Sequence, residues 1–377
     1  MKKFAKIDKD RLLLGIAAPV LAVVAALVVT ALVLLATGKE PFKAFQIMVS
    51  YGFKSDSQVF ILNEATTYYL AGLAVAIGFR MNLFNIGVDG QYRMGAFFGA
   101  VVGGMVTLPS FLEIPLIIVV SMVVAAAWSA IAGFLKVGRG VSEVIATIML
   151  NSIATAVISY LLQPGRLAHL NSNTNSVYTT MLPKSAWFFT MTTNPAAGPI
   201  EGFIVIAVLA GVAYWFVLSR TRFGFDLRTV GQSESAAEAS GVNVKKMIVT
   251  SMIISGALAG LVGMPALLNE AHTYSDEFPT GIGFIGIAVA LLGRNHPVGI
   301  GIGALLWAFL DRTSNWLEFN GYDKEIVGVI QGVIVLCVVI AYEVVRRYGL
   351  GRQQRKVGEE LAAAASLKTV EKAEVTA

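Results

Sequence analysis

The chain has 377 residues, of which 56% are hydrophobic and 14% charged, and its mean hydropathy is +0.70. This composition excludes an ordinary soluble domain and indicates an all-α protein that crosses a membrane several times. The net charge of +5 comes from Lys and Arg gathered in short segments between apolar runs. That pattern is typical of a topological signal and argues against a nucleic-acid partner.

Apolar runs divide the chain into ten expected spans. The first has about 25 nearly uncharged residues, more than the roughly 7–15 of a signal-peptide core, so we expect it to stay as an anchor. Pro109 and Pro115 are expected to bracket a turn between the third and fourth spans. The expected spans are residues 12–36, 59–79, 84–106, 114–135, 142–162, 203–218, 247–268, 282–292, 298–310 and 326–345.

The distribution of basic residues predicts the orientation of these spans. Of the 29 Lys and Arg residues, 21 fall in segments expected inside and 7 in segments expected outside, with Arg93 within a span. This bias predicts that both termini lie in the cytoplasm. Residues 1–351 then form a transmembrane domain with an outer loop at about 163–200 and a cytoplasmic loop at about 220–246. Residues 352–377 form a low-complexity cytoplasmic tail.

The sequence FNIGVDGQ at residues 84–91 sets Asn85, Asp89 and Gln91 inside a membrane-length apolar segment. A carboxylate at that depth costs about 2.5 kcal/mol or more and is normally kept only where it faces a bundle interior or a watery path. We therefore expect these three residues to line or brace a substrate path. The alternative is that Asn85 and Asp89 only cap the start of a helix.

The fifth span adds two polar residues to the expected path. Glu143 and Asn151 are eight residues apart, which places them on roughly the same face of a helix. For Glu143, an acid favoured by the positive end of the helix dipole is an equally good interpretation.

Glycines at a spacing of four predict close helix packing, because they form one stripe on which a second backbone can lie. The residues are Gly95, Gly99 and Gly103 in the third span and Gly256 and Gly260 in the seventh.

Other patterns argue against chemistry within this chain. GIGFIG at 281–286 matches a dinucleotide fingerprint, but it opens a membrane segment and does not follow a strand. The sequence has no GxxxxGK[ST] motif, so any ATP must bind to another subunit. The single cysteine and three scattered histidines offer no metal site, and we find no catalytic site.

The cytoplasmic loop contains ESAAEASG, a short helix of small residues suited to a partner's groove. It resembles the Glu-Ala-Ala coupling loop of bacterial ABC importer permeases, which docks on the ATP-hydrolysing subunit, although an amphipathic linker helix is the alternative. By this resemblance the coupling residues are Glu234, Ala236, Ala237, Glu238 and Gly241.

The wider pattern extends the resemblance over about residues 60–345. FNIGVDGQ, GVSEVIATIMLN at 140–151, SGALAGLVG at 255–263 and GFIGIAVALLGRNHPVGI at 283–300 together look like the permease family of simple-sugar and nucleoside ABC importers. The motif, the outer loop and the long N-terminal half look most like the nucleoside-uptake branch. Two departures are Asp89, where Glu is usual, and Tyr92-Arg93, where an apolar pair is usual. Arg93 can pair with Asp89, four residues earlier on the same face.

This resemblance implies an ABC permease fold of about ten helices in a bacterial plasma membrane. It also implies three partners: a second, unlike permease, an ATPase subunit with two nucleotide domains that binds ATP and Mg²⁺, and an extracytoplasmic lipoprotein that delivers nucleosides. This chain would bind no cofactor itself. The alternatives are a pentose importer of the same class, a secondary transporter that uses Asp89 and Glu143 as proton relays, and a membrane enzyme or scaffold.

Overall fold

The fold comes from a computed structural model that describes residues 24–170, 176–192, 194–322 and 328–348, apart from 339, 342, 343 and 346. The start of the first expected span, the residues around 326 and the predicted tail at 352–377 lie outside the described residues. The described residues fall into two compact units, one made of those within 24–45 and 321–348 and one made of those within 46–320.

The first unit contains a helix at Val24–Ala36 and a short apolar helix at Gly328–Val338. The segment between the first helix and α2 (Pro41–Gly52) is tied to residues far along the chain. The Tyr322 hydroxyl donates to the Glu40 carbonyl at 3.1 Å, and the Lys39 ammonium donates to the Gly321 carbonyl.

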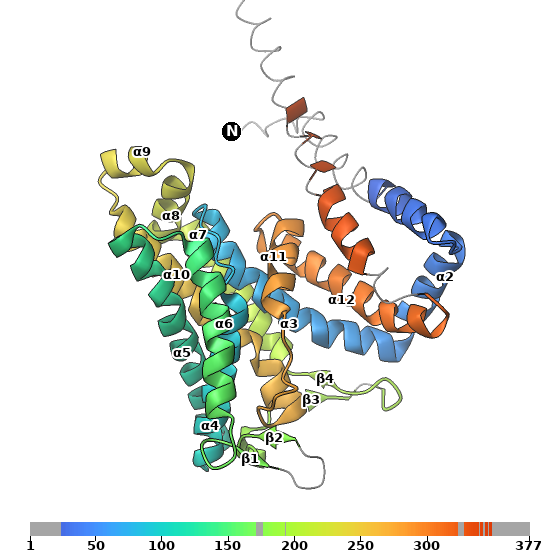
Figure 1. The fold of residues 1–377 in the computed structure, drawn as a ribbon, viewed down its shortest axis with the longest axis horizontal. Coiled ribbons are helices and arrows are strands. Elements are labelled where there is room, and N and C mark those ends of the chain that lie inside the picture. The colour runs from blue at the N-terminus through green and yellow to red at the C-terminus, as the bar shows by residue number, and fades with distance from the viewer. Residues whose placement is uncertain are drawn as a thin grey trace, which may run out of the picture. The chain divides into compact units, whose positions relative to one another are not determined.

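The second unit is a helical bundle with small antiparallel β-ribbons (Figure 1). Strand β1 pairs with β2, with His169 opposite Tyr178, and β3 pairs with β4, with Thr190 opposite Glu201. In chain order the elements are α3 (Ser55–Arg80), α4 (Val88–Met105), α5 (Ser110–Arg139), α6 (Glu143–Leu161), β1 (His169–Leu170), β2 (Val177–Tyr178), the 3₁₀ helix η1 (Lys184–Ala186), β3 (Thr190–Met191), β4 (Ile200–Glu201), α7 (Phe203–Arg220), α8 (Arg222–Gln232), α9 (Glu234–Ala239), α10 (Val244–Val262), the π-helix η2 (Ala266–Ala271), α11 (Ile282–Leu292) and α12 (Pro297–Phe319).

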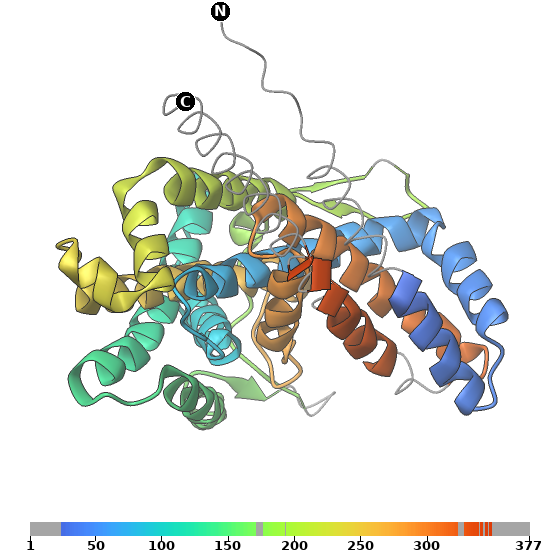
Figure 2. The ribbon, with the colours of Figure 1, turned by 90° about the horizontal axis from the view of Figure 1, so that it is seen from above.

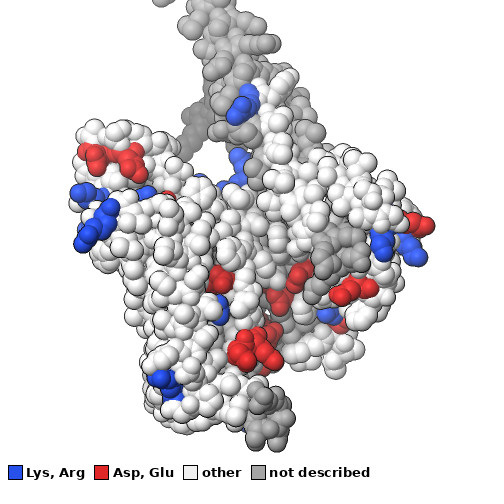
Figure 3. Space-filling view, in the orientation of Figure 1, with Lys and Arg blue, Asp and Glu red and all other residues white. Residues whose placement is uncertain are grey.

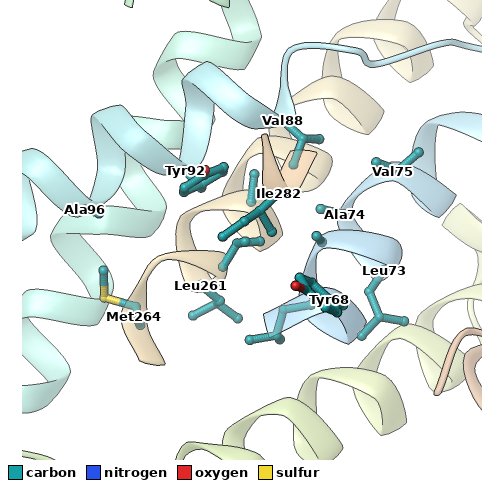
Figure 4. Close-up of a cluster of buried hydrophobic side chains, with 14 of the residues drawn as sticks. Tyr68, Leu73, Ala74, Val75, Val88, Tyr92, Ala96, Leu261, Met264 and Ile282 are labelled. Carbon is teal, nitrogen blue, oxygen red and sulfur yellow. The ribbon is translucent and has the colours of Figure 1, made fainter. Parts of the chain in front are cut away.

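Helix α3 is the centre of this unit because it is apolar on nearly every face. It packs against α10, α11 and α12, and α7 also lies beside it (Figure 2). Figure 4 shows the core where side chains of α3, α4, α10 and α11 meet, including Leu73, Tyr92, Leu261 and Ile282.

The described part of the chain has five helices long and apolar enough to cross a membrane, or six if the bent pair Val24–Ala36 and Pro41–Gly52 counts as one span. In α3 and in the continuous segment Val244–Ala271, 67% of the apolar window is buried, whereas in α5, α6 and α7 the fraction is 28%. The face of α5 and α6 carries few charged groups (Figure 3) and exposes residues such as Val123 and Met149, each 60% exposed. Apolar helices exposed in this way face lipid, so the chain is a multi-pass membrane protein.

The expected turn between Pro109 and Pro115 is wrong, because α5 begins at Ser110 and contains Pro115. Pro115 has no N–H to donate to the Phe111 carbonyl, so the helix lacks one backbone hydrogen bond in its second turn. The Glu113 carboxylate accepts from the Leu108 N–H at 3.3 Å just before this helix.

The predicted glycine stripes lie where helices approach closely. A Cβ on Gly256 would lie 2.6 Å from the Ala125 carbonyl oxygen, and a Cβ on Gly260 would lie 2.6 Å from the Met122 Cα, so α10 rests directly on α5. On α4, a Cβ on Gly95 would lie 2.6 Å from the Ser121 hydroxyl. The remaining two glycines of that stripe face Ile117 of α5, at 3.4 Å for Gly99 and 2.7 Å for Gly103.

Candidate functional site

The polar motif forms the turn between α3 and α4, and its amides pair with each other. Asn85, 1% exposed, donates to the Gln91 Oε1 at 3.0 Å and to the Ser255 hydroxyl at 2.8 Å. In return its Oδ1 accepts from the Gln91 Nε2 at 2.9 Å and from the Gly87 N–H at 3.0 Å. The Ser255 hydroxyl itself donates to the Ala74 carbonyl at 2.6 Å. The network therefore ties the α3–α4 turn to α3, α4 and α10.

Asp89 holds the beginning of another helix. Its Oδ1 accepts from the backbone N–H groups of Gly281 at 2.7 Å and Gly283 at 3.4 Å, at the start of α11. A carboxylate satisfies free N–H groups there and interacts favourably with the positive end of the helix dipole. Its other oxygen lies 4.0 Å from Arg93, whose guanidinium also donates to the Thr155 hydroxyl at 2.9 Å. Asp89 thus pairs with Arg93 and with α11 at once.

Helix α6 contacts the turn at two levels. Glu143 accepts from Lys136 Nζ at 2.6 Å through Oε2 and from the Phe84 N–H at 3.4 Å through Oε1. Two turns further along α6, Asn151 accepts from the Gly90 N–H at 2.9 Å and donates to the Ile86 carbonyl at 3.0 Å. The five residues predicted for the path therefore gather around one turn. In this conformation their polar groups are satisfied by the protein itself, as buried polar groups must be.

The short helix expected in the loop at about 220–246 is α9, built from the ESAAEA segment. Ser233 caps it by accepting from the Ala236 N–H at 3.3 Å, and Gly241 ends it with a φ of +84°, which disfavours side chains. Glu234, Ala236 and Glu238 are exposed, whereas Ala237 is fully buried. Ala237 therefore holds the helix to its own chain and offers no surface to a partner. Helix α9 and the β-ribbons lie at opposite ends of the bundle (Figure 1).

Comparison with known proteins gives the family. Residues 57–339 match the family described as the permease component of the branched-chain amino acid transport system. The chain belongs to this family. It is 33% identical to a guanosine ABC transporter permease of Bacillus subtilis, over 90% of this chain and 96% of that protein. It is 31% identical to a glucose ABC transporter permease of Haloferax volcanii (88% and 89% covered) and 29% identical to a nucleoside ABC transporter permease of Lactococcus lactis (86% and 90%).

The resemblance drawn from the motifs is thus confirmed. This protein is the permease component of an ABC transporter, a part of a transport system.

The end of the permease opposite to α9 carries a group of carboxylates. Glu201, in β4, is 5% exposed. Burial raises its pKa to about 8, with the nearby negative charge of Glu270 as a second cause. Close to this group the Trp187 ring stacks on the His272 ring, with centroids 3.9 Å apart.

Sequence reasoning missed the long-range partners within the permease. Ser255 is part of the quoted SGALAGLVG segment, yet no pattern connects it to Asn85. Gly281 and Gly283 belong to the GIGFIG segment, whose resemblance to a nucleotide fingerprint is misleading. In this structure their N–H groups donate to Asp89, and Gly283 lies so close to it that a Cβ would be 2.3 Å from the Asp89 backbone nitrogen. Lys136 offered a local signal, because it precedes Glu143 by seven residues across a glycine turn.

Proposed function

We propose that this permease forms the translocation path of an ATP-driven nucleoside importer in a bacterial plasma membrane. The observation that carries this proposal is the 33% identity to a guanosine permease across nearly the whole of both chains. A second relative is named for nucleosides. The glucose permease relative, at 31%, makes sugar import the second candidate.

Asn85, Asp89, Gln91, Glu143 and Asn151 are proposed to brace the path and to line it when the helices move apart. Their amides and carboxylates are weak donors and acceptors suited to a neutral, hydroxyl-rich solute, which must be bound without being trapped. The gathering of all five around the α3–α4 turn supports this role.

The proposed topology has about ten spans with both termini inside. The excess of basic residues in the inner segments supports it. The described helices also leave room for further spans, because α4 with 18 residues and α12 with 23 are about 27 and 35 Å long at 1.5 Å per residue. Both fall outside the five long apolar helices because their charged, polar and glycine residues lower the mean hydropathy of the helix.

The proposed partners are an ATPase subunit with two nucleotide domains, a second and unlike permease, and a substrate-delivering lipoprotein. This chain binds no cofactor, and the ATPase holds ATP and Mg²⁺. Helix α9 docks on the ATPase through its exposed residues Glu234, Ala236 and Glu238, followed by Gly241. The exposure of these residues on a capped, rigid helix supports this docking.

The test is uptake of labelled guanosine by proteoliposomes that contain the complete complex, with ATP inside or outside the vesicle. We expect uptake only when ATP is available to the ATPase side, and competition by unlabelled nucleosides. Competition by glucose or ribose but not by nucleosides would replace the nucleoside proposal with the sugar one. Uptake driven by a proton gradient without ATP would refute both.

A further inference from the structure

A cavity of about 470 Å³ lies between α9 and the ends of the membrane helices. Its walls come from the end of α5, the turn into α6, α9 and the beginning of α10. Five charged side chains line it: Lys136, Glu143, Glu234, Glu238 and Lys245. The exposed carboxylates of α9 therefore share one polar space with the ion pair that contacts the α3–α4 turn.

The Lys136–Glu143 pair forms the wall of this cavity nearest the turn. The two charged atoms are 2.6 Å apart, and the side chains are 26% and 10% exposed. Gly140, with a φ of +68°, reverses the chain between the two helices and so allows the pair to form. Because the second oxygen of Glu143 accepts from the Phe84 N–H, one carboxylate touches both the cavity and the polar motif.

Helix α6 extends this contact along the turn. Glu143 begins the helix, and Asn151, on the same face, holds Ile86 and Gly90. A displacement at the start of α6 is thus transmitted to the turn at both levels, since a helix moves as a rigid element.

The geometry points to the Lys136–Glu143 ion pair as the contact that transmits movement of α9 to the α3–α4 turn. In this role Glu143 is a positioning residue. This inference rests on the proposed function, because α9 must be the part on which the ATPase acts. When α9 is pressed toward the membrane, Glu234 and Glu238 approach Lys136. Their carboxylates then compete with that of Glu143 for the positive charge of Lys136. The hydrogen bond that Glu143 accepts from the Phe84 N–H then weakens. The two arrangements differ in defined contacts, as a coupled change requires.

In this role Glu143 braces the substrate path, as proposed above, but does not line it. Substitution of a residue that lines the path would change substrate affinity. Substitution of a residue that transmits movement would change how much substrate is transported for each ATP hydrolysed. The ratio of uptake to ATP hydrolysis therefore separates the two roles.

The experiment measures that ratio, together with membrane abundance, in the reconstituted complex. The variants are Glu143→Gln, Lys136→Met and the reversed pair Lys136→Glu with Glu143→Lys. Lys246→Met is the matched control, since Lys246 is exposed beside the cavity-lining Lys245. We expect both single variants to lower the ratio about fivefold or more, the lower end of typical coupling between sites, and the control to leave it unchanged. The reversed pair should recover abundance but not the ratio, because a lysine at position 143 cannot accept from the Phe84 N–H.

A wild-type ratio in Glu143→Gln would overturn the inference. Recovery of both abundance and ratio in the reversed pair would also overturn it, since an ion pair that only stabilises the fold works in either direction. The ratio is measured with whichever solute the wild-type complex imports. Failure of the nucleoside assignment would appear in the wild type alone, whereas failure of this inference appears only in the comparison of variants.

Discussion

Replacing Asp89 tests whether its charge holds together the helices around the α3–α4 turn. Asp89→Asn keeps an oxygen that can accept from the Gly281 and Gly283 N–H groups, but it removes the partner of Arg93. Removing one member of a buried ion pair costs about 3–5 kcal/mol. The separation here is 4.0 Å and Arg93 retains Thr155, so we expect the lower value, about 3 kcal/mol.

Asp89→Ala removes both contacts. Loss of a helix cap adds about 1 kcal/mol, so the alanine variant should be about 4 kcal/mol less stable than the wild type. The double variant Asp89→Asn with Arg93→Met leaves no unpaired charge and should recover most of the loss seen in Asp89→Asn.

The free energy of unfolding in detergent micelles, measured by denaturant titration of all three variants and the wild type, checks these values. If Asp89→Asn is as stable as the wild type, the carboxylate charge does not hold Arg93. If the double variant is no better than Asp89→Asn, the penalty does not come from the unpaired guanidinium. Equal stability of the asparagine and alanine variants would show that the α11 cap contributes nothing.

Three further outcomes are expected. Gly241→Glu should lower uptake while ATP hydrolysis continues, because a bulky charged side chain after α9 weakens docking on the ATPase. The control is Gly241→Ala, which has the same backbone strain from the positive φ, about 1 kcal/mol, but no charge. This alanine variant should transport nearly normally. Gly260→Val should reduce membrane abundance, because its side chain would meet the α5 backbone, whereas Gly138→Ala, which faces no described atom within 4 Å, should express normally. The folded protein binds a proton at Glu201 up to a pKa of about 8, above the 4.5 of the unfolded chain, so stability should fall as the pH rises between these values. Glu201→Gln should flatten that slope in thermal unfolding measured across the range, and an unchanged slope would contradict the assignment.

The sequence predicted the helices well where charged or small residues bound an apolar run. The expected span at 282–292 is α11, and the one at 142–162 is α6 within a residue at each end. The span expected to stop at 310 continues in α12 to Phe319. It continues because the next two residues, Asp311 and Arg312, have partners: Tyr68 donates to Asp311 at 3.2 Å and Arg312 pairs with Asp56 at 3.1 Å. A charge that looks like the end of a span is tolerated when a distant residue satisfies it.

The candidate site was predictable as a set of residues but not as a set of contacts. Polar residues in an apolar segment, and the same face of α6, directed attention to Asn85, Gln91 and Asn151, because burial of such groups is costly wherever they go. Their partners lie elsewhere in the chain, as Ser255 does for Asn85, and no spacing rule links positions 170 residues apart. Periodicity reports which face a residue occupies, not which helix meets that face.

This difference changes what a substitution in the motif is expected to do. From the sequence alone, Asn85→Leu should leave assembly intact and lower uptake, because Asn85 is regarded as one group on the wall of a path. In the structure the same side chain satisfies Gln91, Ser255 and the Gly87 N–H. Leucine would leave the Gln91 amide and the Gly87 N–H without the partner they have here, at about 1–3 kcal/mol for each one, whereas Ser255 would still donate to the Ala74 carbonyl. The residues proposed to line the path also hold the central helices of this permease together, so membrane abundance must be measured beside uptake before any loss is assigned to the path.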